Sequence, residues 1–166
     1  MEIPTFVWLI LTPLIGSPLI YLLAHSRKRQ AQGIVAQIIG LATMLTAWII
    51  FFQASRILTS YGPSIYTLGS ISLCFDGLSL LLATVTLILG SLVTLFSGPY
   101  LSMEDGQEKF YAMLSAMVGV MIGLGCAQDL FNLWIWFEAM AISSYLLVTF
   151  YRDQPTSLEA GVKYLV

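Results

Sequence analysis

Charged residues are scarce in this sequence, and the shortage limits what the chain can be. Of the 166 residues only 10% are charged, whereas 58% are hydrophobic. A soluble domain usually has about a quarter charged residues. With a net charge of −2, the chain also lacks the basic surface that nucleic-acid binding needs, so we expect no nucleic-acid partner. Most of its surface must therefore meet something other than water, and a lipid bilayer is the expected partner.

Cysteine and histidine are equally rare. Two cysteines, Cys74 and Cys126, and one histidine, His25, cannot make a disulfide framework or a metal cluster. We expect both cysteines to be small apolar residues in or near helices, and His25 to be a solvated loop residue. The sequence also lacks a phosphate-binding loop, a dinucleotide-binding glycine motif and a nucleophile–base pair. We therefore expect no catalytic site, no cofactor and no metal in this chain.

Long hydrophobic runs, in contrast, fill most of the sequence. A helix that crosses a hydrocarbon core of about 30 Å needs roughly 20 apolar residues. Five runs have about this length, and a sixth begins near residue 157; the five cover residues 6–24, 34–54, 78–96, 110–127 and 130–151. The sequence thus predicts an all-α fold: a polytopic transmembrane helix bundle in a single domain over residues 1–166, with five full spans plus the start of a sixth.

The basic residues predict the orientation of this bundle. If successive spans alternate in direction, Arg56 stands alone on one side, and the other side receives Arg27, Lys28, Arg29, Lys109 and Arg152. Cytoplasmic loops carry an excess of Lys and Arg. We therefore expect the basic loops in the cytoplasm or its equivalent, and the N-terminus outside.

The longest connection between spans, residues 55–76, has a pattern of its own. Ser70, Ser72 and Cys74 alternate with apolar residues, and a period of two is typical of extended structure. We expect a short extended or hairpin element on the membrane surface. Asp76 follows it directly and is expected to cap the third span, because Asp is favoured at helix N-caps; a functional role for Asp76 is the alternative.

Glu138 is an acid inside a hydrophobic run. It lies nine residues after Asp129, about 13–14 Å along the fifth span at the rise of an α-helix, and so near the middle of the bilayer. A charge there costs on the order of 2.5–3.5 kcal/mol on insertion scales, and intramembrane acids usually mark an ion or proton path. The alternative is a neutral or salt-bridged Glu138 that only fixes helix packing.

Two further candidate residues lie near the ends of spans. Lys163 would lie about six residues into the sixth span, where partial desolvation lets a lysine take and release protons. It could equally snorkel to the surface or pair with Glu159, one turn earlier. Asp129 directly precedes the fifth span, where it either caps the helix or opens an ion path. Glu138, Lys163 and Asp129 are thus the predicted proton-translocation residues.

The residues around Glu138 also resemble a known family. The stretch DLFNLWIWFE, which ends at Glu138, and the AMAISSYLLV that follows it resemble the fifth-helix signature of the antiporter-like membrane subunits. These subunits occur in respiratory complex I (NADH:quinone oxidoreductase), in multisubunit cation/proton antiporters and in related membrane hydrogenases. The resemblance spans about residues 75–166 and includes FDGLS at 75–79, Phe96-Ser97, Tyr100, Phe110-Tyr111 and LEAGVKYLV at 158–166.

By this resemblance, Glu138 is the family's fifth-helix glutamate, which pairs with a lysine and helps to drive proton transfer. Lys163 matches the lysine near the start of the family's sixth helix. Family members have about fourteen helices in two inverted repeats, so the resemblance implies that this sequence corresponds to the N-terminal part alone. It lacks the helices that carry the family's central lysine.

Two functions follow from these expectations. In the first, the chain is a truncated or split antiporter-like subunit of an energy-transducing complex such as NADH:quinone oxidoreductase. It would sit beside other transmembrane subunits in a bacterial inner membrane or an equivalent membrane, and would contribute to proton or cation translocation through Glu138. The alternative is a truncated relative without transport, which acts as a structural transmembrane subunit of a larger bioenergetic complex.

Overall fold

The computed structural model describes residues 3–26, 29–69, 71–101 and 104–150, with side chains for all of these except 29 and 30. In chain order the elements are α1 Thr5–His25, α2 Arg29–Tyr61, β1 Ser64–Leu68, β2 Ile71–Phe75, α3 Gly77–Leu101, α4 Gln107–Gly125 and α5 Leu130–Val148. Five helices in these ranges are long and apolar enough to cross a membrane. The predicted polytopic transmembrane helix bundle is thereby confirmed.

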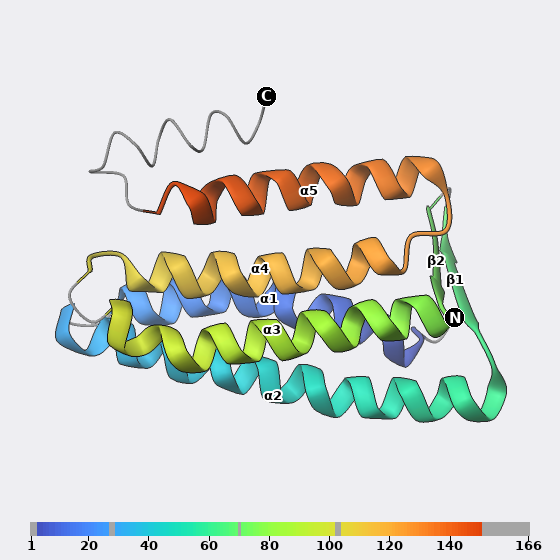
Figure 1. Cartoon of the computed structure of the whole chain (residues 1–166), viewed down its shortest axis with the longest axis horizontal. Coiled ribbons are helices and arrows are strands. Elements are labelled where there is room, and N and C mark those ends of the chain that lie inside the picture. The colour runs from blue at the N-terminus through green and yellow to red at the C-terminus, as the bar shows by residue number, and fades with distance from the viewer. Residues whose placement is uncertain (1–2, 27–28, 70, 102–103, 151–166) are drawn as a thin grey trace.

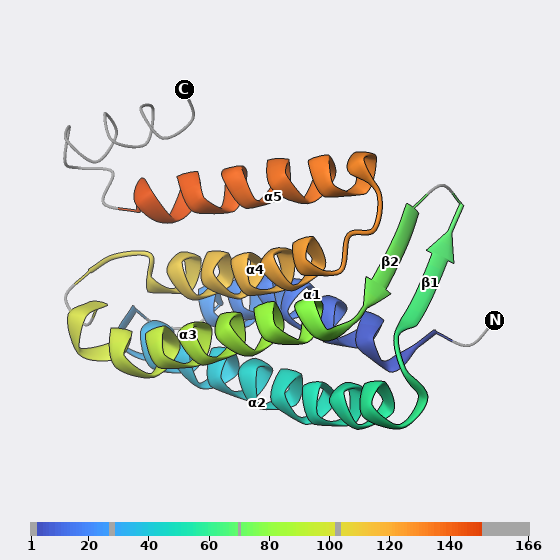
Figure 2. The same cartoon turned by 45° about the vertical axis from the view of Figure 1, so that its right-hand side comes forward.

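Successive helices run in opposite directions, so the bundle has two distinct ends (Figures 1 and 2). The hairpin end holds β1, β2 and the starts of α3 and α5. The loop end holds the ends of α1 and α3 and the start of α4. Lys109, near the start of α4, lies at the loop end, whereas Arg56 lies in the last turns of α2, toward the hairpin end. The side of the membrane that each end faces, and with it the external N-terminus, stays a prediction.

Helix α2 is much longer than the hydrophobic run that predicts it. The run covers residues 34–54, whereas the helix has 33 residues, about 50 Å at the rise of an α-helix. A hydropathy count finds only the apolar part of a helix, and polar turns at its ends can stay helical. Helix α4 likewise begins before its run, and α5 ends at Val148 rather than near 151. The expected sixth span, with Lys163 in it, lies outside the described residues.

Helix α4 is the centre of the bundle and contacts the other four helices. Ser115, Gly119 and Gly123 lie four residues apart on one stripe of α4, and small residues let neighbouring helices approach closely. A Cβ added at Gly119 would lie 2.8 Å from the side chain of Leu14 and 3.2 Å from the backbone oxygen of Ile10. The backbone of α4 therefore packs directly against α1.

The connection between α2 and α3 is a β-hairpin, which confirms the extended element that the alternation in residues 70–75 predicts. Strands β1 and β2 pair antiparallel, with Ser64 opposite Phe75. Gly62 (φ +83°) follows the end of α2, and Gly69 (φ +61°) follows β1. Both adopt left-handed backbone conformations, which glycine tolerates without steric cost.

Candidate functional site

Helix α5, which carries Glu138, lies at the edge of the bundle beside α4 (Figures 1 and 2). Its buried side chains are Asn132, Ser143 and Ser144. Trp136 lies against the backbone of α4, since a Cβ added at Gly123 would lie 2.6–2.7 Å from its indole ring. One side of α5 therefore packs on α4, and the described residues leave the opposite side uncovered.

Glu138 lies on this uncovered side of α5 and is exposed in the described chain. Its face of α5 also carries the side chains at helical spacings of four and seven residues, which are Phe131, Trp134 and Ile142. These three side chains are 57–59% exposed. None of the hydrogen bonds or ion pairs formed within the described ranges involves Glu138. These ranges alone do not enclose Glu138, so the interior position expected for it stays a prediction.

Asp129 is the N-cap of α5. Its Oδ1 accepts a hydrogen bond from the backbone N–H of Asn132 at 2.7 Å, and its Oδ2 accepts one from the backbone N–H of Ser72 at 3.2 Å. Asn132 is buried, and its Nδ2 donates to the carbonyl oxygen of Ser72 at 2.8 Å. The capping interpretation of Asp129 is confirmed, and a role in an ion path stays a prediction. Together, Asp129 and Asn132 attach the start of α5 to β2.

Strand β2 extends this attachment along the connection between α4 and α5. Leu73 forms an antiparallel bridge with Ala127, and the backbone N–H of Cys74 donates to the carbonyl oxygen of Cys126 at 2.8 Å. Sequence reasoning missed this pairing because so short a segment has no periodicity. Both thiols are free, and burial raises the pKa of Cys74 and raises that of Cys126 to about 12. The cysteines are thus the small, uncharged residues that the sequence predicts.

Asp76 caps α3, as the sequence predicts. Its Oδ1 accepts a hydrogen bond from the backbone N–H of Ser79 at 2.9 Å, and this bond is the main reason that the pKa of Asp76 lies below its ordinary value. The buried hydroxyl of Ser79 also lies 2.9 Å from the carbonyl oxygen of Cys74 and 2.8 Å from that of Gly125. One side chain therefore joins α3, β2 and the end of α4.

We expect Asp129→Ala to destabilise the protein by about 1 kcal/mol, the usual effect of losing an N-cap, whereas Asp129→Asn should cost less, because Asn is an equally good N-cap and loses only the longer bond from the N–H of Ser72. Thermal unfolding in detergent measures this difference. Equal stability of the two variants would contradict the capping role. The same pair isolates an ion-path role: Asp129→Asn keeps the cap and removes the charge, so a translocation defect in this stable variant would require the carboxylate itself.

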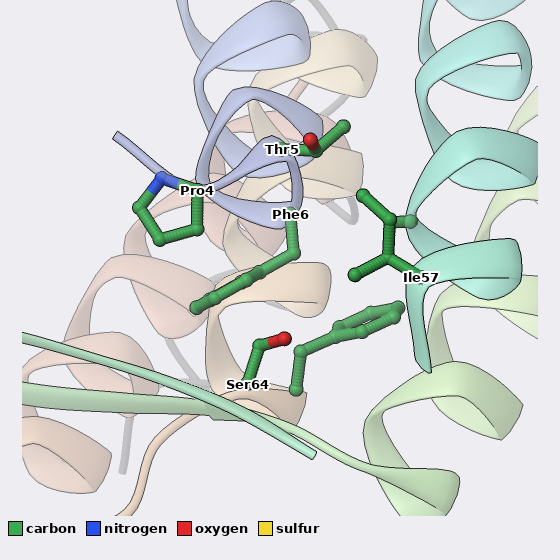
Figure 3. Close-up of a pocket in the computed structure, with 7 residues that line it drawn as sticks. Pro4, Thr5, Phe6, Ile57 and Ser64 are labelled. Atoms are coloured by element: carbon green, nitrogen blue, oxygen red, sulfur yellow. The ribbon is translucent and has the colours of Figure 1, made fainter. Parts of the chain in front are cut away.

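A small cavity lies at the hairpin end, between the start of α1 and the end of α2 (Figure 3). Its volume is about 150 Å³, and it is lined by Pro4, Thr5, Phe6, Ala54, Ile57, Ser64 and Phe75. The rings of Phe6 and Phe75 stack beside it with centroids 5.6 Å apart. Since no side chain in the lining carries a charge, the cavity offers no ionic contact to a ligand. Elsewhere in the described part of the chain, no three His, Cys, Asp or Glu residues are grouped to hold a metal ion.

Sequence reasoning missed a buried acid, Glu108, in the first turn of α4. Its Oε1 lies 3.5 Å from Nδ1 of His25, in the last turn of α1. His25 is solvated, as predicted, because its ring is largely exposed. The prediction that it lies in a loop is wrong, since it belongs to α1 and pairs with a carboxylate. A signal was present, because Glu108, Tyr111 and Ser115 continue the buried face of α4 at spacings of three and four.

Two segments of the chain match known protein families. Residues 68–111 match the family described as "NADH-Ubiquinone oxidoreductase (complex I), chain 5 N-terminus". Residues 127–166 match the family described as "NADH:quinone oxidoreductase/Mrp antiporter, TM". The two matches lie on either side of most of α4 and together include every element from β2 to α5 except that helix.

Individual proteins of both kinds are similar to this chain. NADH-quinone oxidoreductase subunit L of Escherichia coli (strain K12) is 31% identical over 169 residues, which covers 95% of this chain and 27% of that protein. Na(+)/H(+) antiporter subunit A1 of Staphylococcus haemolyticus (strain JCSC1435) is 35% identical over 94 residues, which covers 57% of this chain and 12% of that protein. The chain thus spans about a quarter or less of the length of these relatives.

A solved structure shares the fold. A chain in the structure of the membrane-bound sulfane sulfur reductase (MBS), an archaeal respiratory membrane complex, matches with a TM-score of 0.82 and 22% sequence identity. The match covers 96% of this chain and 33% of that chain. At this level of identity, the likeness is one of fold.

Proposed function

The chain belongs to the family of antiporter-like membrane subunits of respiratory complex I and multisubunit cation/proton antiporters, and on this basis we propose that it forms part of an ion-translocating subunit. The observation that carries the proposal is the likeness to subunit L, which runs along nearly the whole chain. The protein is an integral, multi-pass membrane protein. In the proposal it works beside other transmembrane segments of an energy-transducing complex.

Glu138 is the residue that takes and releases a proton in this proposal. It lies near the middle of α5 on a face rich in large apolar side chains, where an ionised carboxyl facing lipid is costly. A second helix on this face would remove that cost. A lysine on the covering helix would favour the carboxylate when it is close, and its withdrawal would favour the protonated acid. We propose Lys163, or a lysine of a neighbouring segment, for this role.

Copurification tests the proposed assembly. After extraction from its native membrane in mild detergent, the chain should purify together with other transmembrane chains, which mass spectrometry identifies. Among them we expect segments with lysines at mid-membrane depth, since the proposed mechanism needs an opposing charge. A chain that purifies alone under conditions that preserve membrane complexes would contradict the proposal.

A matched pair of variants tests whether the uncovered face of α5 is the contact. Ile142 on α5 and Leu89 on α3 are both 57% exposed, and both lie in the apolar parts of their helices. We expect Ile142→Asn to reduce the yield of copurified chains severalfold, because it places an amide in the contact. Leu89→Asn alters an equally exposed position on α3 instead of α5, and should keep the yield of unsubstituted protein. Equal yields from the two variants would contradict a contact on this face.

A structural role is the second candidate function. The observation that favours it is the lack of a polar partner for Glu138 within the described residues. A subunit of this kind would fill a place in a larger membrane complex without moving ions. Deleting it should then lower the stability of the complex, while removing the Glu138 carboxyl should have no effect on translocation.

A further inference from the structure

Glu108 is a buried carboxylate that is only half satisfied. The side chain of Glu108 is 3% exposed, and its Oε1 pairs with His25. Its other oxygen, Oε2, is also buried and has no hydrogen-bond partner in the part of the chain that the structure describes. Acids are rarely this buried unless they are paired, and a buried charged group without a full set of partners is costly. An ion pair with His25 explains Oε1 but leaves Oε2 unexplained.

His25 connects this buried acid to water. Its side chain is 61% exposed, so the imidazole and the carboxylate share one contact but lie in different surroundings. The ring stacks on Tyr21 with centroids 5.2 Å apart, and this contact supports its orientation toward α4. Imidazole can carry protons because one of its nitrogens can accept a proton while the other donates one. The geometry is therefore that of an exposed proton carrier beside a buried proton acceptor.

Polar groups continue inward from Glu108 along α4. One turn further on, the hydroxyl oxygen of Tyr111 accepts a hydrogen bond from the Oγ of Ser97 on α3 at 3.1 Å. Ser115, another turn on, donates to the carbonyl oxygen of Pro13 on α1 at 2.8 Å. These positions lie on one buried face of α4 and extend about 10 Å from Glu108 at helical rise. Beyond them the core is apolar, at Val118 and the residues packed with it.

We propose that Glu108 and His25 form a proton-exchange site at the loop end of the bundle, which passes protons between water and the polar groups inside α1, α3 and α4. In the transfer step, the N–H bond at Nδ1 of the His25 imidazolium breaks and an O–H bond forms at Oε1 of Glu108. A cation and an anion become two neutral groups, and the reverse step restores them. The step uses neither Glu138 nor Lys163, so it goes beyond the proposed function.

Other titratable side chains at the loop end are more exposed than Glu108, with one exception. The described ones are Tyr21 of α1, Tyr100 of α3, Glu104 and Asp105 between α3 and α4, Lys109 and Tyr111 of α4, and Tyr145 near the end of α5. Of these, Tyr111 is buried beside the polar groups described above. The described polar side chains of α2 near the loop end, Gln32 and Gln37, are uncharged, and Nε2 of Gln37 donates to backbone oxygens of α3. The side chains of residues 27–30 lie outside the described residues.

Infrared spectroscopy of the full chain, purified with the chains that accompany it, tests the site. Difference spectra between acidic and neutral pH report the carbonyl stretch of each carboxyl group that gains a proton. Glu108→Gln should remove one of these bands, and Glu104→Gln should leave that band in place. Glu104 is the matched control because it is the same acid at the same end of the bundle but is exposed. A spectrum that is unchanged in Glu108→Gln would overturn the proposal.

His25→Gln separates proton exchange from a static ion pair, and it alters a largely exposed residue that should not compromise folding. Exchange of the Glu108 proton for deuterium, followed through the infrared band assigned to Glu108, should slow by about tenfold or more, since a positioned acid–base group carries the proton. An unchanged exchange rate would overturn the proposal. Neither the loss of the Glu108 band nor its rate of deuterium exchange requires translocation. The test of this site is therefore independent of the role proposed for Glu138.

Discussion

Replacing Glu138 with glutamine is expected to abolish proton translocation while the amount of assembled complex stays the same. Glutamine has the shape of glutamate but cannot release a proton. The packing of α5 on α4 uses the opposite side of the helix, at residues such as Trp136 and Ser143, so the substitution should not disturb it. Proton uptake into vesicles that contain the reconstituted complex measures the first effect, and the yield of intact complex measures the second.

Glu104→Gln is the control for this experiment. It removes the same chemical group from an exposed position at the loop end, and translocation should not change. Normal translocation by the Glu138→Gln variant would contradict proton transfer through Glu138 and would support the structural role of the chain. Failure of the complex to assemble would instead make Glu138 a packing group, as in the alternative that the sequence leaves open.

The number of spans could be predicted because the bilayer acts on each hydrophobic run separately. Each span must supply about 20 apolar residues whatever its neighbours are, and local patterns likewise predict the caps at Asp76 and Asp129. The pairing of β2 with Ala127 could not be predicted in this way, because it joins segments that are far apart in the sequence. The face of Glu108 on α4 follows from the helical spacing, but its pairing with His25 could not be predicted, because it depends on the end of α1 lying beside the start of α4.

For Glu138, too, some features follow from the local sequence and others depend on distant segments. Its position along α5 follows from the helical rise, and its face on α5 follows from the helical repeat, which puts it with Phe131, Trp134 and Ile142. What covers that face depends on other segments, and no local pattern specifies them. The sequence therefore predicts where the carboxyl group lies along the helix better than it predicts the surroundings on which proton transfer depends.

The position of α5 itself depends on a glycine, and Gly123→Val should displace the helix. A Cβ at this position would lie 2.6 Å from Cη2 of Trp136, closer than such atoms approach, and an indole ring cannot deform to make room. We expect a loss of about 1–3 kcal/mol in stability, typical of overpacking, and loss of translocation because Glu138 moves with α5. Thermal unfolding and proton uptake measure the two effects. At Gly77 an added Cβ would meet nothing within 4 Å, so Gly77→Val should have little effect on either.

A double substitution tests whether the clash with Trp136 is the cause. Trp136→Ala alone should destabilise the protein, because it removes a large side chain from between α4 and α5. Combined with Gly123→Val, it also removes the ring that the new methyl groups would meet. The two changes should then cost less together than the sum of their separate effects, as is expected for residues in contact. Additive losses would mean that Gly123 is needed for another reason, and that α5 is held mainly by the attachment of Asp129 and Asn132 to β2.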